Sequence, residues 1–206
     1  MVRAGGGAKK TSKGPGPAPT RASLHEAALA YLARGAATAD SVTKTLHRRI
    51  ANWARRSARA GRDPEMLEHD VAAARALVPE IVARLGEVGL VNDAAFAETR
   101  ARRLERSGRS RRAISAHLMQ KGVDAAIVRE ALPQDAGAEL AAALAFARKR
   151  RIGPFSRDEH DPRDREVHRK ALGAMARAGF GFDVCERALR MDREAAEERI
   201  RERDVF

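Results

Sequence analysis

Apolar residues recur at helical spacing along most of this chain, and capping residues or glycines separate the periodic stretches. The pattern is clearest from residue 92 to residue 132, where three short amphipathic segments each open on a residue that can cap a helix: Asn92, Ser110 and Asp124. Gly108 ends the first segment and Gly122 the second. The sequence therefore predicts a three-helix unit here, with Gly122 in the left-handed conformation.

Two helices are expected near the start of the chain. The stretch Ser23–Glu26 has the pattern of a capping box, so the first helix is expected to run from there to about Arg34. The second is expected to begin at Asp40 or Ser41 and to carry its basic side chains outside.

A third helix is expected from Pro64, and two residues in this region need interpretation. Pro79 lies inside the helical pattern, so we expect a kink or two abutting helices there. Trp53 lies among arginines and could stack on single-stranded bases. It also lies in register with Leu46 and Ile50, which favours packing in the core.

An internal repeat is visible in the second half of the chain. An alanine-rich helix is expected over 138–151, followed by a loop and a helix that begins near Pro162. Residues 112–132 then align with residues 169–189 at a constant offset of 57 (179 minus 122), which matches Gly122 with Gly179. The last residues, 191–206, are highly charged and are expected to have no apolar face of their own.

The predicted fold class is all-α, an elongated array of three tandem three-helix repeats, because no segment alternates with a period of two. The predicted divisions are a disordered basic tail at 1–20, a first helical repeat with a connecting helix at 21–78, a second (central) repeat at 79–133, a third at 134–190, and a charged tail at 191–206. We expect a monomer whose repeats move relative to one another, because the connecting segments are polar.

Charge points to a polyanionic partner. The chain has 40 Lys and Arg against 28 Asp and Glu, a net charge of +12. From Thr99 to Lys121 there are eight basic residues and a single acid, Glu105. A solvated surface is the alternative, but clustering favours a binding surface for a protein filament or nucleic acid. The predicted contact residues are Arg100, Arg103, Arg111, Arg112, Arg148, Lys149, Arg150 and Arg151.

Other classes of function find little support in the sequence. The lone Cys185 excludes an internal disulfide and is expected to be a small buried residue. Glu159, His160, Asp161 and His168 lack a recognised metal-ligand spacing, and no nucleophile motif or phosphate loop is present. We therefore expect no enzyme activity, cofactor or metal. No apolar run is long enough to cross a bilayer, so we expect a cytoplasmic protein with no membrane partner.

Several motifs together resemble a known family. Phe96-Ala97, then Gly108-x-Ser110, then Leu118-x-x-Lys121-Gly122-Val123 and the closing stretch from Ile127 to Leu132 resemble the central repeat of the RecX family. Arg177-Ala178-Gly179-Phe180 is similar to that family's final signature, and Ala28-Leu29-x-Tyr31-Leu32 is weakly similar to its opening. The resemblance covers roughly residues 24 to 190. One departure is Arg100-Ala101, where the family often has larger apolar residues.

The resemblance implies a function. RecX proteins are negative modulators of the RecA recombinase that bind the RecA–DNA filament and inhibit its ATPase, strand exchange and co-protease activities. Such a protein would regulate homologous recombination, DNA repair and the SOS response, with RecA as its partner and DNA contacted through the basic face. The alternative is a general DNA- or RNA-binding helical repeat protein, for which arginine-rich helices would suffice.

Overall fold

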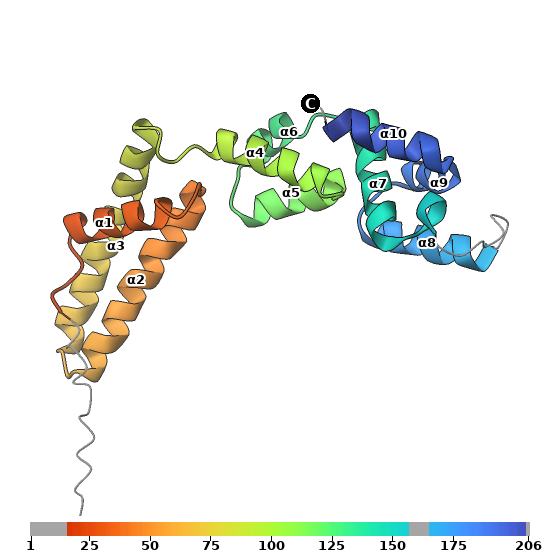
Figure 1. The fold of residues 1–206 in the computed structure, drawn as a ribbon. Helices are drawn as coiled ribbons and strands as arrows, with labels where there is room; N and C mark the ends of the chain where they lie inside the picture. Colours follow the sequence, from red (N-terminus) through yellow and green to blue (C-terminus); the bar gives the residue numbers. More distant parts are fainter. Residues whose placement is uncertain (1–15, 157–164, 205–206) are drawn as a thin grey trace, which may run out of the picture. The chain divides into compact units, whose positions relative to one another are not determined.

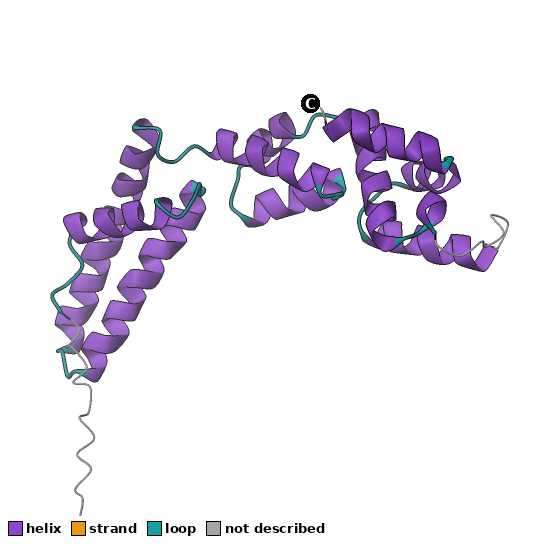
Figure 2. Cartoon of the chain, viewed as in Figure 1, coloured by secondary structure: helices purple, strands orange, loops and turns teal. Residues whose placement is uncertain are grey.

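The computed structural model describes residues 16–156 and 165–204, and within these residues the chain is all helical with no strand (Figures 1 and 2). This confirms the predicted all-α class. The chain divides into an N-terminal unit, Met1–Val91, and a C-terminal unit, Asn92–Phe206. Most of the predicted basic tail, at 1–15, and the stretch with Glu159, His160 and Asp161 lie outside the described residues. None of the described helices is both long and apolar enough to span a bilayer.

The N-terminal unit consists of three helices: α1 (Arg21–Leu32), α2 (Ala39–Arg59) and α3 (Pro64–Glu87). The long helices α2 and α3 lie side by side, and α1 packs on both (Figure 1). The core is built from aliphatic residues at helical spacing, among them Leu24, Leu46, Ile50, Val78 and Leu85, all fully buried. Hydrophobic periodicity therefore accounts for the packing of this unit.

The starts of the first two helices differ from the prediction. The capping box of α1 is formed by Thr20 and Ser23, where each side chain bonds the backbone of the other, and Ser23–Glu26 is not the cap. Helix α2 begins at Ala39 because the Thr38 side chain accepts a hydrogen bond from the Ser41 N–H. In both cases a threonine preceding the predicted cap supplies an earlier acceptor for the free N–H groups of the first turn.

Pro79 lies inside α3, which continues through it as one helix, so the alternative of two abutting helices is wrong. Its neighbours Val78 and Ile81 are buried in the core, whereas Pro79 itself is exposed. Packing on both sides therefore offsets the hydrogen bond that proline cannot donate. The start of α3 is as predicted, with Asp63 accepting from the Met66 N–H and Pro64 in the first turn.

Trp53 is buried, with 3% of its surface exposed. Its indole Nε1 donates a hydrogen bond to the Gly16 carbonyl at 3.3 Å, and the Arg62 guanidinium lies 5.2 Å from the ring centroid. The favoured interpretation of Trp53 as a packed residue is confirmed, since a buried ring cannot serve as a platform for bases.

The C-terminal unit begins with a three-helix cluster: α4 (Asp93–Arg106), α5 (Arg111–Gln120) and α6 (Ala125–Ala131). The predicted caps are all present, because Asn92, Ser110 and Asp124 each accept a hydrogen bond from a first-turn N–H. The helices meet in a small core of Ala97, Ala101, Ile114, Leu118, Val123, Val128 and Leu132. Ala101, at the departure from the family pattern, is buried, so the small side chain lets α4 approach its neighbours closely.

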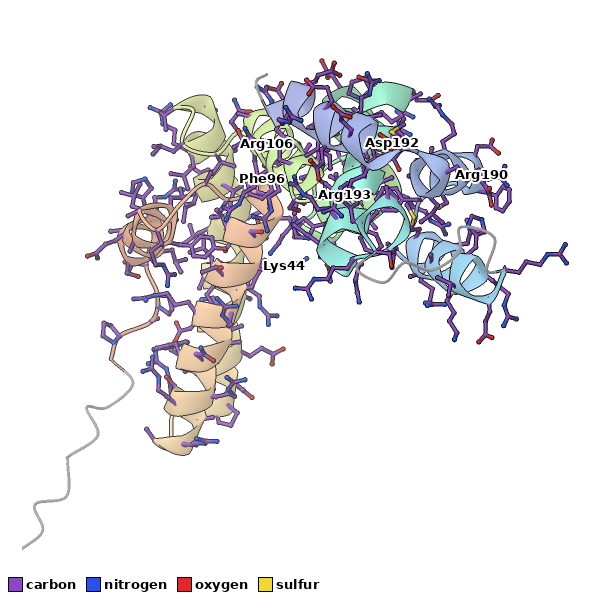
Figure 3. All side chains as sticks on the ribbon, turned by 45° about the vertical axis from the view of Figure 1, so that its right-hand side comes forward. Lys44, Phe96, Arg106, Arg190, Asp192 and Arg193 are labelled. Carbon is purple, nitrogen blue, oxygen red and sulfur yellow. The ribbon has the colours of Figure 1, made fainter. Side chains whose placement is uncertain are left out.

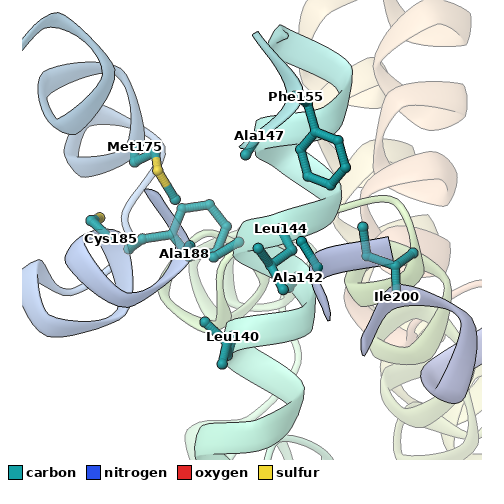
Figure 4. Packing of buried hydrophobic residues seen from close by; sticks show 12 residues of the cluster. Leu140, Ala142, Leu144, Ala147, Phe155, Met175, Cys185, Ala188 and Ile200 are labelled. Carbon is teal, nitrogen blue, oxygen red and sulfur yellow. The ribbon is translucent and has the colours of Figure 1, made fainter. Parts of the chain in front are cut away.

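The remaining helices of this unit surround α7 (Ala136–Arg150). They are a short 3-10 helix (Gly153–Phe155), α8 (Arg165–Arg177), α9 (Phe182–Arg190) and α10 (Arg193–Asp204). Figure 4 shows Leu140 and Leu144 of α7 between Met175 and Ala188 on one side and Ile200 on the other. Cys185 is buried in the same core, and burial raises the pKa of its thiol, which fits an inert apolar residue as expected.

The internal repeat is confirmed at the helix boundaries. Helix α5 ends at Gln120 and α8 at Arg177, while α6 begins at Ala125 and α9 at Phe182, so both pairs differ by the predicted 57 residues (177 minus 120, 182 minus 125). Gly122 has a φ of 77° and Gly179 a φ of 93°. As predicted, each glycine follows the end of its helix in the left-handed region, which other residues adopt at a cost.

Replacing Gly122 with valine is expected to destabilise the protein by at least about 1 kcal/mol, because a β-branched side chain opposes a φ of 77°. Urea unfolding of the wild-type and variant chains, followed by circular dichroism, measures the difference in the free energy of unfolding. Equal stability of the two proteins would show that the turn relaxes to another conformation without strain.

Helix α10 corrects the expectation for residues 191–206. The segment was expected to lack an apolar face, but Ala196 and Ile200 are fully buried in the core around α7. Two apolar residues four positions apart lie on one face of a helix, which is sufficient for a helix that packs mainly along α7.

Within the C-terminal unit, the α4–α6 cluster packs against the helices that follow it. The Ser110 hydroxyl donates to the Ala178 carbonyl at 2.7 Å, and Lys149 Nζ donates to the Ser107 carbonyl at 2.5 Å. A Cβ added at Gly108 would lie 2.8 Å from the backbone nitrogen of Phe146, so only glycine fits at this crossing. These contacts argue against independent motion of the second and third repeats.

Candidate polyanion-binding surface

The eight basic residues singled out from the sequence all lie in the C-terminal unit, but they differ in their surroundings. Six are exposed, and Arg100 and Arg111 are half-buried. The exposed members are Arg103, Arg112, Arg148, Lys149, Arg150 and Arg151. The local contacts therefore decide which of these charges face solvent and which hold the unit together.

Arg111 is a structural residue. Its guanidinium Nε donates to the Leu132 carbonyl at 3.0 Å, at the end of α6, where no helical donor satisfies that group. Its backbone N–H donates to Glu139 Oε2 at 2.9 Å. Burial, with the nearby charge of Glu105, raises the pKa of the Glu139 carboxyl, while Arg111 opposes that shift. Both Arg111 and Arg112 were predicted contact residues, but only Arg112 is exposed, whereas Arg111 is half-buried and bonded within the unit.

The end of α7 carries four consecutive basic residues with different contacts. Arg150 lies over the Phe146 ring at 5.7 Å, and Arg151 ends the helix in the left-handed region with a φ of 55°. Lys149 bonds the Ser107 carbonyl at the end of α4. Cations at a helix C-terminus are also favoured by the helix dipole, which is a structural reason for this composition.

The bond from Lys149 places the end of α7 beside the end of α4, so the basic residues of the two last turns lie on neighbouring elements. We call this set the α4–α7 basic surface: Arg103 and Arg106 of α4, and Arg148 and Lys149 of α7. The side chains of Arg103 and Arg148 are exposed and form no hydrogen bond or ion pair with another described residue. Their charge is therefore available to an external anion.

Comparison with known proteins places this arrangement in a family. The family model described as RecX, second three-helix domain, matches residues 92–132, which hold α4, α5 and α6. The regulatory protein RecX of Myxococcus xanthus is 38% identical over 192 residues, covering 90% of this chain and 95% of that protein. The chain belongs to the RecX family. Regulatory protein RecX of Agrobacterium fabrum, another member, is 32% identical over 168 residues, covering 73% of this chain and 89% of that protein.

Arg100 donates a hydrogen bond to an unusual partner, a histidine ring. Its Nε donates to Nε2 of His117 at 3.2 Å, which requires the neutral form of the imidazole. Burial lowers the pKa of His117, and the charges of Arg100, Arg109 and Lys121 lower it further. Protonation of His117 would add a fourth positive charge to those of Arg100, Arg109 and Lys121 and would break the bond from Arg100.

The stability of this RecX protein is expected to fall as the pH drops below about 6.5, the ordinary pKa of histidine. Below that pH, His117 is protonated in the unfolded state but stays neutral in the folded state. The free energy of unfolding therefore falls with pH until the lower pKa of the folded state is reached. Urea unfolding between about pH 7.5 and 5.5 measures the slope. Glutamine at position 117 keeps an acceptor without a proton to bind, so His117→Gln should flatten the profile; an unchanged slope would assign it to other groups.

Arg111 and Arg112 offer a direct comparison between a structural and an exposed arginine. Arg111→Glu is expected to destabilise the protein by about 2 kcal/mol, because it removes the bond to Leu132 and adds a carboxylate near Glu139. Arg112→Glu should change the free energy of unfolding by less than about 0.5 kcal/mol. Thermal unfolding of the two single variants makes the comparison, and similar destabilisation by both would show that the Arg111 contacts are not decisive.

Sequence reasoning did not assign a site to the arginines of α2 in the N-terminal unit. One signal was available, since α2 has no acidic residue from Ser41 to Arg59. Several other cations pair with an acid on their own helix: Lys44, at the start of α2, pairs with Asp40, and Arg190 of α9 pairs with Glu186 (Lys44 and Arg190 are labelled in Figure 3). The arginines farther along α2 lack such neighbours on their own helix.

Proposed function

We propose that this protein is a negative regulator of the RecA recombinase that binds the RecA–DNA filament and inhibits its ATP turnover, strand exchange and co-protease activities. The observation that carries the proposal is membership of the RecX family over nine-tenths of the chain, with relatives named regulatory proteins. Its role would be to restrain homologous recombination, DNA repair and the SOS response in the cytoplasm. RecA is the proposed partner, and the protein acts as a monomer without a cofactor.

The α4–α7 basic surface supports this proposal physically. A filament of recombinase on DNA presents phosphates and acidic side chains in a repeated arrangement, and several unpaired cations on one surface favour association with such an array. Inhibition then requires only occupancy of the filament. No reaction on a substrate is part of the mechanism, and the active groups are the arginines of the last turns of α4 and α7.

The test is a titration of the purified chain into RecA on single-stranded DNA with ATP. The expected result is a saturable fall in ATP hydrolysis that weakens as salt is raised, because screening reduces the attraction between the protein and the filament. Strong binding to bare DNA with unchanged ATP hydrolysis would instead support the general nucleic-acid-binding protein.

A further inference from the structure

A groove in the N-terminal unit is lined by arginines that the proposed function does not use. It lies between α1, α2 and the segment Pro17–Thr20, with a volume of about 1140 Å³. Six of its lining residues are arginines: Arg34, Arg48, Arg49, Arg55, Arg56 and Arg59. All six are exposed, and none of the lining residues is an acid.

The positive charge of this groove is largely uncompensated. Arg55 donates to the Asn52 side chain, and Arg34 lies over the Tyr31 ring at 5.3 Å. The side chains of the other four arginines form no hydrogen bond or ion pair with another described residue. Like charges held on one helix repel one another, so an anion that enters the groove would relieve an unfavourable interaction.

The spacing of the arginines suits a chain of phosphates. From Arg48 to Arg59 the helix rises by about 16 Å, at about 1.5 Å per residue, and the arginines along it recur at helical intervals. A guanidinium binds phosphate oxygens through two parallel hydrogen bonds, which makes arginine well suited to a phosphate backbone. The groove therefore matches a linear polyanion better than a single small anion.

We propose that this groove binds single-stranded nucleic acid through its phosphate backbone. Helix α1 packs on α2 and forms the second wall, so the arginine face is not a free helix that could enter the major groove of a duplex. A positively charged groove that follows the backbone is the usual mode for a single strand. The apolar lining outside Tyr31 and the buried Trp53 is alanine and proline, which offers little to anchor the side chains of an acidic peptide.

The proposal is independent of recombinase inhibition, because the groove lies wholly within the N-terminal unit and its assay contains no RecA. The test variant is Arg49→Gln with Arg56→Gln. The matched control is Arg75→Gln with Arg84→Gln, which removes the same charge from exposed positions on α3, outside the groove. Circular dichroism of the full-length variants checks that each is folded.

The measurement is the fluorescence anisotropy of a labelled 15-nucleotide oligothymidylate titrated with each protein. The groove variant should bind at least ten-fold more weakly than wild type, and its plot of log affinity against log salt should be shallower by about 1.4, for two lost phosphate contacts. The control should change less than three-fold. Equal weakening in both variants would show that only net charge matters and would overturn the proposal.

Three further measurements test the identity of the ligand and the place where it binds. A labelled 15-base-pair duplex that binds the wild type more tightly than the single strand would overturn the preference proposed here, as would polyglutamate that displaces the oligonucleotide at lower concentration. Photocrosslinking from 4-thiothymidine is expected to modify peptides within residues 17–59. Crosslinks confined to the C-terminal unit would place the strand elsewhere and refute the assignment.

Discussion

Replacing Gly108 with alanine is expected to destabilise the C-terminal unit by about 3 kcal/mol, the largest effect on stability among the substitutions considered. The φ of 80° is unfavourable for any L side chain by roughly 1–2 kcal/mol. The new Cβ would also lie 2.8 Å from the Phe146 backbone nitrogen and 3.1 Å from the Ala145 backbone carbon, so α4 and α7 must separate. Forcing extra atoms into a packed site costs roughly another 1–3 kcal/mol.

Gly61→Ala is the control for this substitution. Gly61 has nearly the same φ, 81°, but a Cβ there would meet nothing within 4 Å. The difference between the two variants therefore isolates the close approach of α4 and α7. Thermal unfolding should show a midpoint lowered by roughly 10 °C for Gly108→Ala and by less than half of that for Gly61→Ala. Equal shifts would mean that the helices tolerate the added methyl group by sliding.

Local chemistry explains how much of the fold could be predicted. Asn92, Ser110 and Asp124 cap their helices as expected, because capping depends only on the next three residues. The wrong prediction at Ser23–Glu26 has the same local origin, since Thr20 and Ser23 form a competing capping box that begins three residues earlier. Packing against a distant helix could not be predicted in this way, and the burial of Ile200 on α7 depends on it.

The contacts of the candidate surface likewise could not be predicted from local sequence. Composition identified the arginines near α5, but the partner of Arg111 is the Leu132 carbonyl, 21 positions away, at a helix end whose place is set by tertiary packing. The clustering of charge alone placed Arg111 among the contact residues. The arginines of α2 were recognisable from the absence of acids, yet their groove requires α1 as a second wall, which only the folded unit supplies.

The largest functional effect is expected from reversing the charge of the α4–α7 basic surface. Arg103→Glu with Arg148→Glu replaces two exposed, unpaired cations, one in the last turn of α4 and one in the last turn of α7. Half-maximal inhibition of recombinase ATP hydrolysis should then require at least ten-fold more protein, which corresponds to about 1.4 kcal/mol of binding free energy. The fall should be largest at low salt, where the attraction is least screened.

The control must carry the same change of charge and the same cost to the helix dipole. Arg177→Glu with Arg187→Glu meets both conditions, because these exposed arginines occupy the last turns of α8 and α9. Circular dichroism and thermal unfolding should show similar, small losses of stability in the two double variants. Full inhibition by the folded Arg103/Arg148 variant would show that these arginines are only solvated surface charges. A stronger loss of inhibition in the control would indicate that α8 and α9 contact the filament instead.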